Sequence, residues 1–237
     1  MVYITGDIHG DIAPIYALWE KFHPTKNDII IILGDAGINY TGRLRDRILK
    51  EDLSALKSTF FCIHGNHESR PQHIASYREK KWKGGRVLYE EDFPSILFPV
   101  DGDIFEIEEK QCLVIGGAYS VDKIYRLRNG WNWWPDEQPT PTIKAYVEEQ
   151  IKEKKVDVVF SHTCPFKYIP TECLLPEIDQ SSVDNSTEQW LDTIEEMLDY
   201  EAWYMGHWHI DKRIDKMHLL FHGVEVLRTD CENKNES

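Results

Sequence analysis

Residue types that bind metal ions recur along this sequence, each time directly after a short apolar run. The first motif is Gly6-Asp7-Ile8-His9, where a carboxylate and an imidazole are two positions apart. Taken alone, it has two interpretations: a turn in which Asp7 caps the next helix, or a pair of metal ligands. Four later segments end in the same way, which favours the ligands: Gly34-Asp35, Gly65-Asn66-His67-Glu68, Ser161-His162 and Gly206-His207-Trp208-His209.

The chemistry of the combined set is that of a divalent metal site. It offers carboxylates, imidazoles and one amide oxygen without a thiolate, which suits ions such as Mn, Fe or Zn. The candidates exceed the ligands of one tetrahedral ion and, with one bridging carboxylate, suit two ions about 3.5–4 Å apart. We therefore expect two divalent metal ions. The candidate ligands are Asp7, His9, Asp35, Asn66, His162, His207 and His209.

The apolar runs before these motifs predict strands buried on both faces, because they are mostly continuous rather than alternating. In open α/β sheets, ligands bind at the carboxyl ends of the strands, so the polar side chains should gather at one edge. The predicted strands are Val2–Thr5, Ile29–Leu33, Phe60–His64, Leu113–Ile115, Val156–Phe160 and Ala202–Met205.

Helical patterns alternate with these strands. Apolar residues recur at helical spacing in 44–56, 141–151 and 190–198, the last behind a predicted capping box of Ser186 and Gln189. Segment 86–115, with its Asp101-Gly102 pair, predicts a hairpin, and 212–227 predicts further short strands. This alternation predicts an α/β protein with one or two mixed sheets.

Length, net charge and cysteine content limit the classes of function and the cellular location that we expect. The 237 residues fit a single domain, 1–237, and the net charge of −14 disfavours nonspecific nucleic-acid binding. No apolar run is long enough for a membrane span, so we expect no membrane partner. The chain begins with a strand instead of a signal sequence, and its five cysteines form no C-x-x-C pair. These features predict a cytoplasmic protein.

The ordered motifs GDIHG, GD, GNHE, SH and GHWH, which span residues 6 to 209, resemble those of the calcineurin-like metallophosphoesterase superfamily. GDIHG and GNHESR are especially similar to its Ser/Thr protein phosphatase branch. The resemblance implies two mixed β-sheets packed as a sandwich, flanked by helices, with a dinuclear metal site at one edge. It also implies that Asp7, His9 and His209 bind one ion, that Asn66, His162 and His207 bind the other, and that Asp35 bridges them.

The same resemblance implies a metal-dependent phosphoesterase. A hydroxide bridging the two metals would attack phosphorus, and His67 would donate a proton to the leaving group. A supporting or capping role for His67 is the alternative. One motif departs from the phosphatase pattern: in GDAGINY, Ile38 and Asn39 replace an Asp that orients the catalytic histidine and an Arg that binds phosphate. The sequence therefore leaves both functions unassigned, and GDAG is closer to small bacterial members of the superfamily.

Segment 116–140 contains Arg126 and the Trp133-Trp134 pair. One interpretation is a loop over the site, with Arg126 binding the substrate phosphate and a tryptophan stacking on a ring. The other is a packed loop whose tryptophans cover a sheet edge.

The leading hypothesis is a hydrolase. A binding or scaffold module on the same fold is the alternative, although such members have typically lost ligands that are all present here. Ser/Thr protein phosphatase activity is an alternative choice of substrate. Phosphoproteins, nucleotides, dinucleoside polyphosphates and nucleic-acid ends all remain compatible with the motifs.

Overall fold

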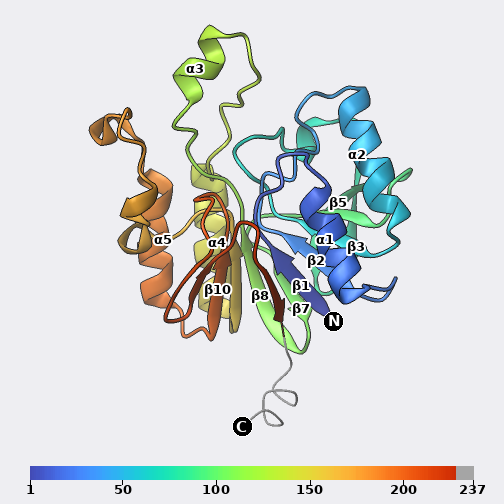
Figure 1. Cartoon of the computed structure of the whole chain (residues 1–237). Coiled ribbons are helices and arrows are strands. Elements are labelled where there is room, and N and C mark those ends of the chain that lie inside the picture. Colours follow the sequence, from blue (N-terminus) through green and yellow to red (C-terminus); the bar gives the residue numbers. More distant parts are fainter. Residues whose placement is uncertain (228–237) are drawn as a thin grey trace.

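The chain forms two mixed β-sheets that pack face to face, with helices on their outer surfaces (Figure 1). The computed structural model describes residues 1–227. Within this range, no helix is long and apolar enough to cross a membrane.

The first sheet has seven strands in the order β13-β1-β2-β3-β6-β5-β4. Strands β1 (Val2–Thr5), β2 (Ile29–Ile32) and β3 (Thr59–Cys62) run parallel and in register, with Thr5 opposite Ile32 and Ile32 opposite Cys62. Their carboxyl ends consequently lie at one edge. The remaining strands are β4 (Tyr77–Trp82), β5 (Gly85–Glu90), β6 (Ile96–Pro99) and β13 (Val224–Leu227).

The second sheet has six strands in the order β11-β12-β10-β9-β8-β7. Strands β8 (Lys110–Ile115), β9 (Val158–Ser161) and β10 (Ala202–Met205) are parallel, and Ile115 lies opposite Ser161. Their carboxyl ends therefore form a second aligned edge. The other strands are β7 (Ile104–Ile107), β11 (Lys212–Ile214) and β12 (Met217–Leu219).

Helices cover both outer faces. In Figure 1, α1 (Ala13–Phe22) and α2 (Leu44–Ala55) lie on the first sheet, and α4 (Pro141–Glu153) and α5 (Ser186–Met197) lie on the second. The short α3 (Lys123–Arg128) projects beyond the sheets in the loop after β8. Short 3₁₀ turns are found at Pro71–His73, Phe166–Tyr168, Thr171–Cys173 and Gln180–Ser182.

Three apolar clusters hold these layers together. One joins the inner faces of the sheets, where Ile31 and Phe61 share a cluster with Phe105 and Phe160. The others lie between each sheet and its helices. Because each central strand contributes alternate residues to two clusters, it is buried on both faces, which explains the continuous apolar runs of the sequence.

The predicted strands and helices are all present, but two local predictions were wrong. Ser186 is the first residue of α5 rather than its cap, and its N–H donates to Asp184 Oδ1 at 3.0 Å. Asp101-Gly102 does not close a hairpin; it connects β6 of the first sheet to β7 of the second. The antiparallel pairs of consecutive strands in this segment are β5–β6 and β7–β8, and the second turns at Glu108 and Glu109, which both have positive φ.

The four described cysteines are free thiols, and Cys231 lies outside the described residues, as does the end of the predicted domain from 228 to 237.

The inner-face cluster should dominate stability. Phe105 is fully buried, with its ring centroid 5.0 Å from that of Phe61. We expect Phe105→Ala to lower the free energy of unfolding by about 3–5 kcal/mol, because it leaves a cavity between the sheets. Urea unfolding followed by circular dichroism measures this loss. Ile48→Ala, at a half-exposed position of α2, is the control and should change stability by less than about 0.5 kcal/mol. Equal effects of the two substitutions would contradict the assignment of the core.

Candidate metal centre

The fold brings the carboxyl ends of strands from both sheets to the same place. Asp7, Asp35 and Asn66 follow β1, β2 and β3 of the first sheet, and His162 and His207 follow β9 and β10 of the second. Three overlapping groups result, in each of which the possible ligand atoms lie within 4.8 Å of one another: Asp7, His9 and His209; His9, Asp35 and His67; and Asp7, Asp35 and His162. Each group could hold a metal ion.

Asp35 lies at the centre of the cluster. Its Oδ1 accepts the backbone N–H of His67 at 2.8 Å. Its Oδ2 lies 3.8 Å from His9 Nδ1 and 3.7 Å from both His67 Nδ1 and His162 Nε2. One oxygen is thus fixed by the backbone, while the other faces imidazoles from several strands.

Asp7 ties the two sheets together. Both of its oxygens accept the backbone N–H of His207, at 2.9 and 3.1 Å. Its Oδ2 also lies 3.3 Å from His209 Nε2 and 3.8 Å from His9 Nε2. The nitrogens His9 Nε2 and His209 Nε2 are 2.9 Å apart, so a single small ion could contact both rings.

Asn66 and His162 are held by contacts on the side away from the cluster. Nδ1 of His162 lies 2.8 Å from the carbonyl oxygen of Leu33, which leaves Nε2 to face the cluster. The Asn66 amide donates to Ser120 Oγ at 2.9 Å, and its Oδ1 lies 2.8 Å from His162 Nε2. His207 is in none of the three groups, but its ring centroid is 5.0 Å from that of His162.

The electrostatics of the cluster favour the forms that bind metal. Burial lowers the pKa of His207 strongly and that of His9 to a smaller degree, so both rings tend to be neutral. Burial opposes ionisation of Asp35, yet His162, His67 and His9 hold its pKa below the usual value. His209 differs, because its hydrogen bond to Asp7 raises its pKa. The donor set of carboxylates, imidazoles and an amide oxygen therefore fits a divalent metal pair.

Glycines permit the close approach of neighbouring strand ends. A Cβ on Gly65 would lie 1.9 Å from Asp35 Oδ1, and a Cβ on Gly206 would lie 2.1 Å from Asp7 Oδ1. Asp35, His9, His207 and His209 have positive φ angles, between 46° and 66°. Such conformations are costly for residues other than glycine and persist where the surrounding structure imposes them, commonly at functional sites.

Comparison with known proteins agrees with this geometry. The family model for calcineurin-like phosphoesterases matches residues 1–211. The chain belongs to the calcineurin-like phosphoesterase family. One solved crystal structure superposes on this chain with a TM-score of 0.50 and 12% sequence identity. The match covers 92% of this chain and 88% of the chain in that structure, and it supports the fold alone. No curated protein matched the sequence.

Within this phosphoesterase fold, His67 has an acidic neighbour that the motifs did not reveal. Its Nε2 lies 3.6 Å from Oδ1 of Asp122, slightly beyond hydrogen-bond distance. That oxygen is buried and has no hydrogen-bond partner among the described residues, whereas Oδ2 accepts from Arg126 Nε at 2.8 Å. Burial raises the pKa of Asp122, but His67 and Arg126 outweigh it and hold the pKa below its usual value. Asp122 therefore presents an ionised, unpartnered oxygen to His67.

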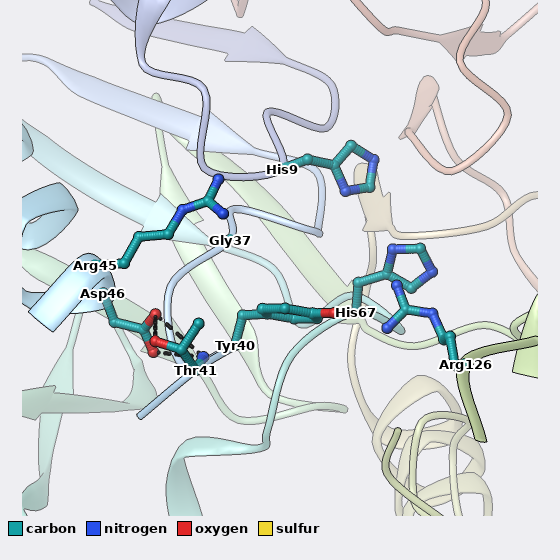
Figure 2. A pocket seen from close by; sticks show the side chains of 8 residues that line it. All are labelled: His9, Gly37, Tyr40, Thr41, Arg45, Asp46, His67 and Arg126. Atoms are coloured by element: carbon teal, nitrogen blue, oxygen red, sulfur yellow. Dashed lines mark hydrogen bonds between the residues drawn. The ribbon is translucent and has the colours of Figure 1, made fainter. Parts of the chain in front are cut away.

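Arg126 and Arg45 line a small cavity of about 160 Å³ beside His9 and His67 (Figure 2). The guanidinium group of Arg126 points toward His67, and its Nη1 donates to the carbonyl oxygen of Asn132 at 2.8 Å. Arg45 points toward Gly37 and His9, and it has no hydrogen bond or ion pair within residues 1–227. The phosphoesterase motifs gave no reason to select Arg45, because it lies in the first turn of α2 rather than after a strand.

The tryptophans of the same segment do not line this cavity. Trp133 donates to Glu137 Oε2 at 2.7 Å and lies beneath Lys123, while Trp134 contacts Tyr40 edge to face. These contacts favour packing of the tryptophan pair against neighbouring loop residues over stacking on a substrate ring.

The close approach at Gly65 can be tested through metal binding. We expect Gly65→Ala to weaken Mn²⁺ binding about 10- to 100-fold, because the new methyl group must displace the Asp35 carboxylate. Titration calorimetry measures this affinity. Gly42→Ala is the matched control: a Cβ on Gly42 would meet no atom within 4 Å, so this variant should retain wild-type metal affinity despite the φ of +65° at this position. Wild-type affinity in Gly65→Ala would contradict the proposed geometry.

Proposed function

We propose that this family member is a metal-dependent phosphoesterase that hydrolyses phosphate esters at a dinuclear site. The observation that supports this most directly is the convergence of ligand atoms into three overlapping groups. Asp7, His9 and His209 would hold one ion, Asn66, His162 and His207 the other, and Asp35 would contact both. When bound, Mn, Fe or Zn ions would supply positive charge for the phosphate oxygens and lower the pKa of water.

His67 is the proposed proton donor. It lines both the small cavity and a larger one on the other side, so its ring lies where the two meet. The Nε2–H group of His67 is directed to Asp122. The Nδ1 atom of the same ring therefore faces Asp35, and a proton on Nδ1 would be directed to the departing oxygen on that side. Asp122 would fix this orientation and stabilise the protonated ring. It would thereby supply the carboxylate that GDAGINY lacks.

The cations of the small cavity would bind the phosphate. Arg45 has no carboxylate partner within the described residues, and Arg126 retains a terminal nitrogen beyond its contacts to Asp122 and Asn132. A guanidinium group pairs well with phosphate oxygens. Arg45 and Arg126 are therefore the proposed phosphate-binding residues.

Loss of the central carboxylate should abolish activity. We expect Asp35→Ala, or chelation of the wild-type protein, to reduce hydrolysis of p-nitrophenyl phosphate in Mn²⁺ to background. Saturating metal should also raise the melting temperature of the wild type, because an ion that binds the folded state stabilises it by about 2.7 kcal/mol at 100 times Kd. Asp35→Ala should lose this increase, and Asp92→Ala, at an exposed turn, should keep both properties. A metal-stabilised wild type that hydrolyses no ester would favour a binding module instead.

The role of Asp122 can be tested by varying the leaving group. We expect Asp122→Asn to slow the hydrolysis of alkyl phosphates at least about tenfold, because a poor leaving group needs the proton that His67 provides. Hydrolysis of p-nitrophenyl phosphate should change less than about threefold, since its leaving group departs without a proton. Steady-state kcat values for the two substrates give the ratio. Asp92→Asn should leave the ratio unchanged, and equal losses for both substrates in Asp122→Asn would refute the positioning role.

A further inference from the structure

A larger cavity of about 860 Å³ opens beside the metal centre. Its floor includes Asp35, Asn66 and His67, so it is continuous with the site where a phosphate would react. Its volume falls in the upper part of the range for small-molecule sites. A group much larger than a phosphate could therefore extend from the reaction centre into it.

The walls of this cavity are mostly apolar. They come from the loop after β8 and from segment 166–185, and include Val121, Phe166, Leu174, Leu175, Ile178 and Val183. Three of these side chains are unusually exposed for their type: Val121 at 43%, Phe166 at 42% and Leu175 at 53%. Exposed apolar side chains that gather around a hollow are typical of ligand-binding sites.

The charges in the larger cavity oppose an anionic occupant. Lys167 is the one lysine or arginine among the described residues that line it, and its Nζ is paired with Glu195 Oε2 at 2.7 Å. Asp122 and Glu188 add acidic groups to the wall. The small cavity on the other side of His67 has the opposite character, because it contains Arg45 and Arg126. The small cavity is thus suited to a phosphate group, and the larger cavity is suited to an apolar group.

We propose that the larger cavity binds the organic group of the substrate, and that the preferred substrate is a phosphate ester of an alcohol with an extended apolar group. This inference rests on the proposed phosphoesterase function and narrows it. Nucleotides, nucleic-acid ends and dinucleoside polyphosphates would place further charge or polar groups against a wall whose one lysine, among the described residues, is already paired with Glu195. An alkyl or alkylphenyl group instead gains the burial of its methylenes against Leu174, Leu175 and Val183.

Phosphates of 4-alkylphenols provide the test, because lengthening the alkyl chain barely changes the chemistry of the leaving group. From phenyl to 4-hexylphenyl phosphate, kept below the micellar concentration, we expect kcat/KM to rise about fourfold per buried methylene. Binding of the matching 4-alkylphenylphosphonates, which are not hydrolysed, should tighten in parallel by calorimetry. The double variant Val121→Thr/Leu175→Asn should flatten both dependences. Met197→Asn is the control, at a half-exposed apolar position that lines neither cavity, and should preserve them.

The outcomes separate this inference from the proposed function. Hydrolysis without any dependence on chain length would overturn the inference alone. A kcat/KM for a 5′-mononucleotide or a phosphopeptide above that of the longest alkylphenyl phosphate would also overturn it. Phosphonate binding that tightens with chain length, without hydrolysis of any ester in the presence of metal, would support the apolar site and overturn the phosphoesterase proposal.

Discussion

The Asp35 carboxylate determines the arrangement of the candidate metal centre, because it contacts groups from both sheets at once. One oxygen is fixed by the backbone N–H of His67, and the other faces His9, His67 and His162 within 3.8 Å. A buried carboxylate of this kind is costly unless positive charge or hydrogen bonds compensate it. The glycine at 65 allows the two loops to approach closely enough for that compensation. The proposed chemistry depends on this contact, whereas the packing of the sheets depends mainly on the apolar cluster between them.

Much of this arrangement could be predicted from the sequence, since it follows from the direction of the strands. Parallel strands place their carboxyl ends together, so an apolar run followed by a polar group predicts both the strand and the position of its side chain. Asp7, Asp35 and His162 gather for this reason. The helix α1 was not predicted, although Pro14 lies in its first turn. Ile15 and Leu18 are its two buried residues, too few to give a clear helical pattern.

The parts that could not be predicted depend on long loops. Asp122 lies seven positions beyond the end of β8, and nothing in its local sequence distinguishes it from a surface aspartate. It faces His67 because the loop after β8 folds back over the ends of the first sheet, where Ser120 also contacts Asn66. Asp101-Gly102 has the composition of a hairpin turn, but pairing partners in the two sheets determine where the chain goes. The path of such loops is set by tertiary contacts rather than by the local preferences of their residues.

Two cavities meet at His67, one lined by arginines and the other mostly by apolar side chains. The proposed binding of phosphate in the first and of the organic group in the second requires two metal ions between them that share Asp35. Electron paramagnetic resonance of the protein loaded with two equivalents of Mn²⁺ tests that claim most directly. A dinuclear site should give the spectrum of an exchange-coupled manganese pair, replaced by that of isolated ions in Asp35→Ala. Two independent six-line signals in the wild type, or saturation at one ion per chain, would contradict it.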